Sequence, residues 1–236
     1  MNLLDFAILA VFAIFVLSGI YKGFLSTLFS IGAYLVSWLL GVVLIPVGAG
    51  IVKGSASLFN MMLYYTEGSE YIADTELART AVSSLSTTEI NAVVTSADVP
   101  YPMGKRILEN VASEAFSKDG ITTLGDYFNQ TIVCVFISIL VFLIIFCIIR
   151  AALAFILNGV DYAWRLPVLR TGDGILGGGL GLVHGILAVF LLFMLLPIGL
   201  VFLSGKLDFV TDLVNESFFA HFFYRSNFIL GMMPGV

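Results

Sequence analysis

The sequence predicts an all-α integral membrane protein with four transmembrane helices and an extracytoplasmic helical insert between the second and third of them. Hydrophobic residues make up 59% of the 236 residues and charged residues 11%, whereas a soluble domain carries roughly 25% charged residues. The apolar residues gather in four runs, and the acidic excess gathers between the second and third runs. A soluble fold of this size cannot bury so much apolar surface. The composition therefore excludes a soluble enzyme, a disordered regulator and a nucleic-acid binder with a basic face.

Four apolar runs are long enough to cross a bilayer as helices, which takes about 20 residues each. The first two form a transmembrane hairpin over residues 1–50, and the last two form a second hairpin over residues 131–204. In lipid, every backbone polar group must be satisfied within its own segment, so the runs are predicted to be helices. The predicted spans are about 3–20, 24–47, 131–157 and 175–203.

An acidic insert, residues 51–130, separates the two hairpins. It holds five basic and ten acidic residues, and this difference equals the whole net charge of −5. Apolar residues recur at helical spacing in residues 77–85 and 107–116. Thr87 or Thr88 is placed to cap a further short helix between these stretches. We expect three or four short helices in this insert.

An aromatic-rich tail, residues 205–236, carries a charge every few residues, which is typical of an amphipathic helix lying in the membrane interface. Lysine and arginine near the ends of spans indicate the cytoplasmic side. Lys22 lies in the first short connection, and Arg150, Arg165 and Arg170 lie in or beside the second. We therefore expect a multi-pass protein of the cell membrane with both short connections in the cytoplasm and the insert and both termini outside.

No arrangement of residues is typical of a catalytic, cofactor or metal site. Cys134 and Cys147 lie in one apolar run and are expected to behave as small hydrophobic residues. His184 and His221 lie far apart in the sequence, and neither has a matched serine and acid. The string Gly-x-Gly-x-x-Gly at residues 172–177 lacks the strand–turn–helix context of a dinucleotide fingerprint. We expect no enzyme activity, no cofactor and no metal.

The fourth span carries glycines and a histidine on one helical face. Gly177, Gly181 and Gly185 share this face with His184 at about 100° per residue. Small residues let another helix approach closely in lipid, which favours helix packing as the role of the glycines. His184 lies about 13 Å into the span, close to the bilayer midplane. Two roles are open for it: a neutral histidine hydrogen-bonded between helices, or a group in a proton or solute path.

Charged residues lie near the ends of the spans. Asp5 is placed to cap the first span, and Arg150 is placed to extend toward the cytoplasmic face. Lys22, together with Gly19 and Gly23, is expected to form a tight turn that carries one positive charge. The turn and the glycine face are the predicted helix-packing motifs.

Asp173 directly precedes the fourth span. It either caps the helix N-terminus, where the helix dipole favours a carboxylate, or pairs with Arg170 or Lys22 at the cytoplasmic face. The candidate functional polar residues are therefore Asp5, Lys22, Asp173 and His184.

Three motifs follow one another along the spans. They are Asp5 at the head of the first span, Tyr21-Lys-Gly-Phe24 opening the second, and Thr171-Gly-Asp-Gly-Ile-Leu-Gly177 with Gly181 and His184-Gly185 in the fourth. This ordered set resembles the colicin V production protein (CvpA) family of bacterial inner-membrane proteins, over the four spans but not the insert. The chain departs from the family at Gly174 and His184, where arginine is frequent. The resemblance implies a role in colicin V production or export, or in cell-envelope homeostasis, and it implies no catalytic residues.

Three functional hypotheses follow. The first is a non-enzymatic membrane protein that supports peptide toxin production or envelope homeostasis through partners. The second is a small oligomeric channel or transporter with His184 lining the path. The third is a membrane anchor whose insert binds a ligand outside the cell. The expected partners are the lipid bilayer and either further copies of the chain or other membrane and envelope proteins, with no nucleic acid.

Overall fold

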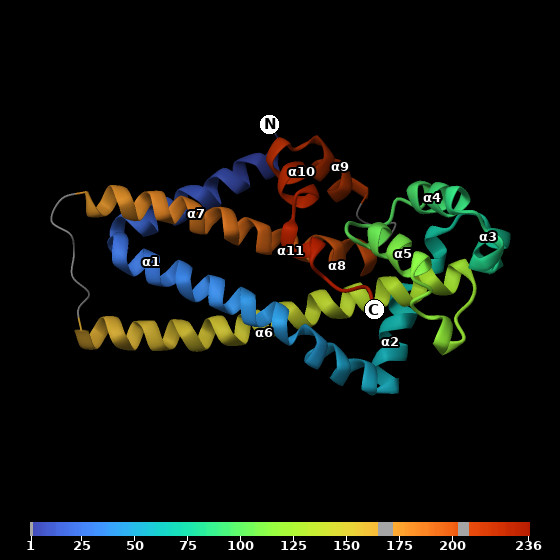
Figure 1. Ribbon diagram of the computed structural model, residues 1–236. Helices are drawn as coiled ribbons and strands as arrows, with labels where there is room; N and C mark the ends of the chain where they lie inside the picture. The colour runs from blue at the N-terminus through green and yellow to red at the C-terminus, as the bar shows by residue number, and fades with distance from the viewer. Residues whose placement is uncertain (1, 165–171, 203–207) are drawn as a thin grey trace. The chain divides into compact units, whose positions relative to one another are not determined.

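The computed structural model describes residues 2–164, 172–202 and 208–236, and its regular elements within these ranges are helices (Figure 1). Three helical stretches are long and apolar enough to cross a membrane. They are α1 (Leu3–Gly54), α6 (Leu124–Trp164) as far as Gly159, and the stretch Asp173–Val201. Within the described residues the predicted all-helical fold is confirmed, and three long apolar stretches that could span a membrane stand where four separate spans were expected.

The first two predicted spans both lie within α1. Gly23 interrupts this helix, with φ of 78° and ψ of 176°. This left-handed φ favours glycine, because a Cβ atom would clash there. Figure 1 shows α1 folding back on itself, so it has a first arm, residues 3–22, and a second arm, residues 24–54. Only one residue leaves helical geometry, so the turn between the two predicted spans is much tighter than a loop.

The third and fourth predicted spans also differ in their limits. The third was expected at residues 131–157, but α6 already begins at Leu124 and continues to Trp164. The fourth, expected at residues 175–203, consists of α7 (Asp173–Phe193) and α8 (Leu195–Phe202), and its expected last residue lies outside the described residues. Pro197 explains the end of α7, because its ring clashes with the carbonyl four residues earlier, that of Phe193.

Short helices make up the remaining parts of the structure. The insert contains α2 (Ala56–Thr66), α3 (Thr75–Arg79), α4 (Thr87–Ser96) and α5 (Met103–Ala112), with 3-10 turns at Gly68–Tyr71, Val82–Ser84 and Ser117–Asp119. The tail contains α9 (Asp208–Glu216), α10 (Phe218–Arg225) and α11 (Phe228–Gly231).

The insert departs from the predicted periodicity at residues 77–85. The helix α3 ends at Arg79, because the next residues pair with a distant segment. Val82 N donates a hydrogen bond to Thr122 O at 2.9 Å, and Leu124 N donates to Thr80 O at 3.0 Å. Residues that exchange such ladder hydrogen bonds cannot remain helical, so this amphipathic stretch is only in part a helix.

The next helix, α4, begins with a capping box. Ser86 Oγ accepts a hydrogen bond from Glu89 N, and the Glu89 carboxylate accepts one from Ser86 N at 2.8 Å. Hydrogen bonds from Ser86 hold the pKa of the Glu89 carboxyl below its usual value, and the one from the Ser86 backbone N–H has the largest effect. The N-cap residue is therefore Ser86, one or two residues before the predicted caps Thr87 and Thr88, because Ser86 and Glu89 together form the capping box.

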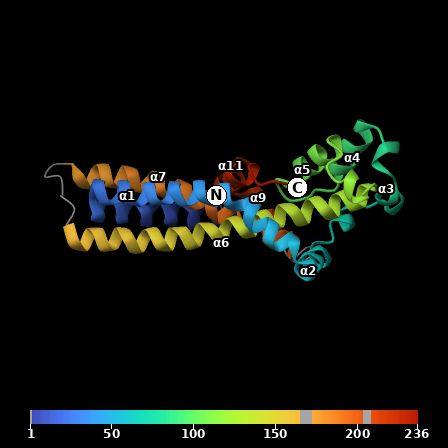
Figure 2. The same ribbon diagram turned by 60° about the horizontal axis from the view of Figure 1, so that its bottom comes forward.

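One compact unit, called unit 1 here, joins Met1–Leu44, Phe142–Leu195 and Gly205–Ile229. Within it, the arms of α1 lie alongside α7 and the later part of α6 (Figures 1 and 2). The tail helix α10 packs on α7. The ring centroid of Phe223 lies 4.9 Å from that of Phe190. Unit 1 therefore includes part of the tail as well as parts of the long apolar helices.

A second compact unit, unit 2, joins Ile45–Val141, Leu196–Ser204 and Leu230–Val236. The first part of α6 forms its core, where Ile132 and Val133 are 0% exposed. This segment reads as a membrane span by composition, yet protein covers it on every side. The insert helices therefore supply much of the apolar surroundings that lipid supplies to the other long helices.

Polar side chains join the last residues of the chain to unit 2. Asn110 Nδ2 donates hydrogen bonds to Thr131 Oγ1 at 2.9 Å and to Gly235 O at 2.8 Å. Ser138 Oγ, on α6, donates to Pro234 O at 3.2 Å. Because Asn110 and Thr131 are buried, these hydrogen bonds offset the cost of removing their polar atoms from water.

The close approach of α1 and α7 depends on glycine residues. Two substitutions in α7 test this dependence. A Cβ atom added at Gly181 would collide with the carbonyl oxygen of Phe15, whereas one added at Gly179 meets nothing within 4 Å. We expect Gly181→Ala to lower the free energy of unfolding by about 1–3 kcal/mol, as overpacking does. Gly179→Ala, which changes helix propensity equally, is expected to be neutral or slightly stabilising.

Denaturant unfolding of the purified chain in micelles, followed by circular dichroism, measures both effects. Equal stability of the two variants would contradict the close approach of α7 to the first arm of α1.

Candidate functional site

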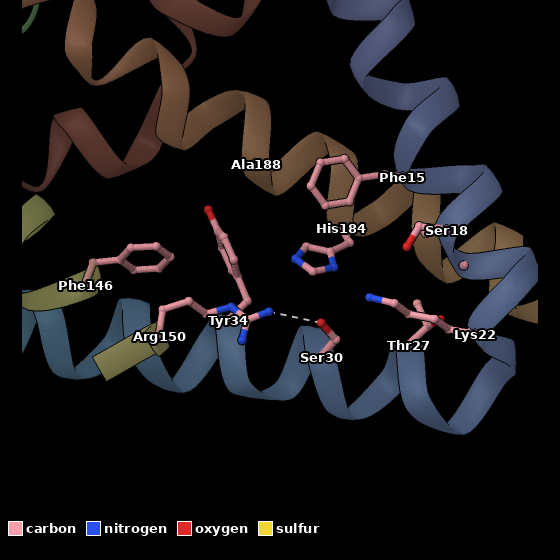
Figure 3. A pocket seen from close by; sticks show the side chains of 12 residues that line it. Phe15, Ser18, Lys22, Thr27, Ser30, Tyr34, Phe146, Arg150, His184 and Ala188 are labelled. Carbon is pink, nitrogen blue, oxygen red and sulfur yellow. Dashed lines mark hydrogen bonds between the residues drawn. The ribbon is translucent and has the colours of Figure 1, made fainter. Parts of the chain in front are cut away.

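A cavity of about 310 Å³ lies within unit 1, between the two arms of α1, α6 and α7 (Figure 3). This is the lower end of the range of about 300–1,000 Å³ for small-molecule sites. Its walls combine aromatic rings and small residues with polar side chains. The polar lining residues are Ser18, Lys22, Thr27, Ser30, Tyr34, Arg150 and His184.

His184 lies at the centre of the cavity wall. It is half-buried, and its ring centroid lies 4.8 Å from that of Phe15 and 5.5 Å from that of Tyr34. Within the described part of the chain, its ring nitrogens make no hydrogen bond to a neighbouring helix. Of the two roles open from the sequence, the structure therefore favours a histidine that faces a cavity over one that joins two helices.

Tyr34 closes one side of the cavity. Its hydroxyl group donates a hydrogen bond to Leu187 O at 2.7 Å, which ties the second arm of α1 to α7. Its ring contacts that of Phe146 on α6, with centroids 5.1 Å apart. Tyr34 is 4% exposed. It therefore connects three helices and holds the wall beside His184 in place.

Arg150 points into the cavity from α6. Its Nη2 atom donates a hydrogen bond to Ser30 Oγ on the second arm of α1 at 3.1 Å (Figure 3). From the sequence we expected this side chain to extend to the cytoplasmic face at the end of the third span; in the structure it is directed into the cavity and contacts Ser30. The helix continues well beyond it to Trp164, so Arg150 lies within the helix, and the Ser30 hydroxyl offers a nearby acceptor.

Lys22 approaches the cavity from the end of the first arm. Figure 3 shows its ammonium group, the His184 ring and the Arg150 guanidinium group directed toward one space. No carboxylate is present among the residues that line the cavity. Within the described residues, neither Lys22 nor Arg150 makes an ion pair. Among the described residues, the cavity lining therefore carries two positive charges that are not in an ion pair with a carboxylate.

Asp173 lies beside the turn of α1 and does not line the cavity. Its Oδ1 atom accepts a hydrogen bond from Phe24 N at 3.1 Å, so it caps the second arm of α1. The expected cap of its own helix is not formed, since Gly172 is the N-cap residue of α7 and has no side chain to offer. Of the expected pairs, Lys22 is not in an ion pair with Asp173, and Arg170 lies outside the described residues.

Asp5 forms a separate polar centre at the start of α1. Its carboxylate accepts hydrogen bonds from Asn2 N at 2.9 Å, Ser217 Oγ at 2.7 Å and Phe219 N at 2.9 Å. It therefore stabilises the first turn of α1 and the first turn of α10 together. Asp5 is 0% exposed and lies away from the cavity lining. Its position points to a structural role in docking α10.

The predicted packing glycines meet at one helix crossing beside the cavity. A Cβ atom at Gly19 would collide with the carbonyl oxygen of Gly177. A Cβ atom added at Gly185 would lie 3.2 Å from the Phe15 Cβ atom. Gly19 and Gly181 also line the cavity, so the crossing and the cavity share residues. Gly23, by contrast, lies against the Asp173 carboxylate at the turn.

Four polar residues of the cavity, Ser18, Thr27, Ser30 and Tyr34, were not predicted from the sequence, and Arg150 was assigned to the cytoplasmic face rather than to a cavity. A signal for Ser30, Tyr34 and Arg150 was present. Ser30 and Tyr34 are four residues apart on the second predicted span, so they share a helical face. Arg150 is a charged residue followed by further apolar residues, which is typical of a functional group inside a span.

The described residues offer no group of three or more His, Cys, Asp or Glu side chains that could hold a metal ion. Comparison of the chain with protein-family models, curated proteins and solved structures finds no match. The case for a function therefore rests on the residues and the geometry of this chain.

Proposed function

We propose that the chain is a multi-pass protein of the bacterial cell membrane in which both arms of α1 cross the bilayer, making four crossings. At 1.5 Å per residue, the first arm is about 30 Å long, which matches the hydrocarbon core. The backbone reversal at Gly23 supports two crossings within α1. The position of Lys22 at this reversal supports a cytoplasmic turn. The insert and both termini then lie outside.

Cysteine labelling of intact cells tests the four crossings. In a chain with Cys134 and Cys147 replaced by alanine, single cysteines at Ser69 and Asn215 are expected to react with a membrane-impermeant maleimide. A cysteine at Tyr21, which is 92% exposed, is expected to react only after the membrane is permeabilised. Reaction of all three positions from outside would contradict the crossings of α1.

We further propose that the protein is a small channel or transporter, with the cavity of unit 1 as its solute site and His184 lining the path. The observation that carries this proposal is the convergence of Lys22, Arg150 and His184 on one cavity. Arg150 and His184 lie inside long apolar helices, where an ionisable group usually marks a substrate or ion pathway. Four helices seldom enclose a pore, so the proposal includes assembly of several copies of the chain.

A histidine exchange tests the solute path. His184→Phe replaces the polar ring with an apolar one in the cavity and is expected to reduce flux at least tenfold. His221→Phe is the matched control, because His221 is the other histidine and lies exposed on α10. The measurement is the flux of protons and small solutes into liposomes that contain the purified chain. Absence of chain-dependent flux, or unchanged flux in His184→Phe, would overturn the proposal.

A second proposal is a role in peptide toxin production or envelope homeostasis, like that implied by the resemblance to the CvpA family. Supporting it, the residues of the resemblance gather in space. Gly19 meets Gly177, and the Asp173 carboxylate caps the helix after Gly23. Apart from Asp5, which docks α10, these residues of the resemblance thus build one helix crossing and one turn, which is a reason for them to occur together.

Deletion of the gene tests the envelope role. We expect the deletion strain to show reduced tolerance of envelope stress or reduced peptide secretion, with recovery on expression of the intact chain. Normal tolerance together with normal secretion would count strongly against this role. The liposome measurement is independent of this outcome, so the two proposals can fail separately.

A further inference from the structure

The cavity of unit 1 has an excess of positive charge. Lys22 and Arg150 carry permanent charges, and His184 adds a group that can only be neutral or positive. The residues that line the cavity include no carboxylate to offset them. Lys22, which is exposed, and Arg150, which is half-buried, direct two permanent positive charges toward one cavity, so a bound anion stabilises this arrangement by charge attraction and a bound cation does not.

Hydrogen-bond donors in the cavity fall into two groups. The Thr27 hydroxyl donates to Gly23 O and the Tyr34 hydroxyl donates to Leu187 O, each at 2.7 Å, so both are occupied. Arg150 uses one of its five N–H donors on Ser30. The other Arg150 donors and the Lys22 ammonium group have no hydrogen-bond partner among the described residues. The two cationic groups can only donate, so the part of the cavity between them suits a ligand rich in acceptor oxygens.

The number and placement of the positive charges distinguish between a carboxylate and a phosphate group as the ligand. A carboxylate has one charge and two oxygens in one plane, so it balances only one of the two cations. A phosphate group carries up to two charges and presents oxygens in several directions. It can therefore contact Lys22 on the first arm and Arg150 on α6 at once, in the way that arginine and lysine commonly bind phosphate.

We propose that the cavity binds a phosphate group held between Lys22 and Arg150, with His184 beside it. This inference rests on the proposed function, since it takes the cavity of unit 1 as the ligand site. The volume of about 310 Å³ accommodates either free inorganic phosphate or the phosphate of a phospholipid head group. Apolar side chains exposed on the same helices, such as Leu17 at 65%, allow lipid to lie close by.

Equilibrium dialysis of the full-length, delipidated chain against radioactive inorganic phosphate tests the proposal. The ionic strength is held constant with chloride. Arg150→Gln and Lys22→Gln are each expected to weaken phosphate binding at least tenfold. Lys118→Gln, which removes an exposed lysine of the insert, is expected to leave it unchanged. Arg150→Lys keeps the charge but loses the guanidinium fork, and is expected to fall between Arg150→Gln and the unchanged chain.

A second arm of the experiment identifies the source of the phosphate group. Dihexanoyl phosphatidylglycerol and dihexanoylglycerol, which lacks phosphate, compete with the bound radioactive phosphate. If the phospholipid displaces the radioactive phosphate at a concentration at least tenfold lower than unlabelled phosphate does, the site is assigned to a lipid head group. Comparable displacement by both assigns it to free phosphate. Displacement by the phosphate-free lipid would overturn the proposal.

Two further results would overturn it. One is no saturable binding of either phosphate probe, and the other is binding that Arg150→Gln and Lys22→Gln leave unchanged. Thermal unfolding of each variant confirms that it is folded before its binding is compared. Flux in liposomes without phosphate binding would remove this inference and retain the proposed channel. Phosphate binding without flux would remove the proposed channel and retain the phosphate site.

Discussion

The close approach of the first arm of α1 to α7 sets the geometry on which the cavity depends. Lipid provides no hydrophobic force that drives two apolar helices together, so their association needs surfaces that fit closely. Gly19 and Gly177 meet without side chains between them, and Gly181 lies against the backbone at Phe15. The same crossing directs His184 into the cavity. A larger residue at any of these glycines would move the helix that carries the histidine.

Polar groups in the long helices fall into two classes, and the contrast between them indicates function. Thr27 and Ser37 return their hydroxyl groups to the carbonyl four residues earlier, each at 2.7 Å. Such groups are satisfied locally and need no ligand. Lys22, Arg150 and His184 instead direct their polar atoms into a shared space. Polar groups with a purely structural role would be expected to find hydrogen-bond partners within the protein, as the hydroxyl groups do.

Sequence reasoning predicted the candidate site only in part. His184 and Lys22 were recognised because an ionisable residue within or beside an apolar run is unusual. Arg150 was recognised as a charge but assigned to the membrane face, because the end of the third span could not be located from apolar residues alone. Asp173 was assigned to its own helix, because a sequence shows which residues are adjacent along the chain but not that Phe24 lies beside them.

The sequence by itself determined that the chain is helical and has segments long and apolar enough to cross a membrane, since apolar length and the scarcity of charge are properties of composition and order. It also determined that the insert forms short helices, because their periodicity is local. Only the tertiary structure decided that the first part of α6 is covered by protein and that Lys22, Arg150 and His184 share one cavity. These facts depend on contacts between distant segments, where a single positive φ at Gly23 and a few glycine contacts select the arrangement.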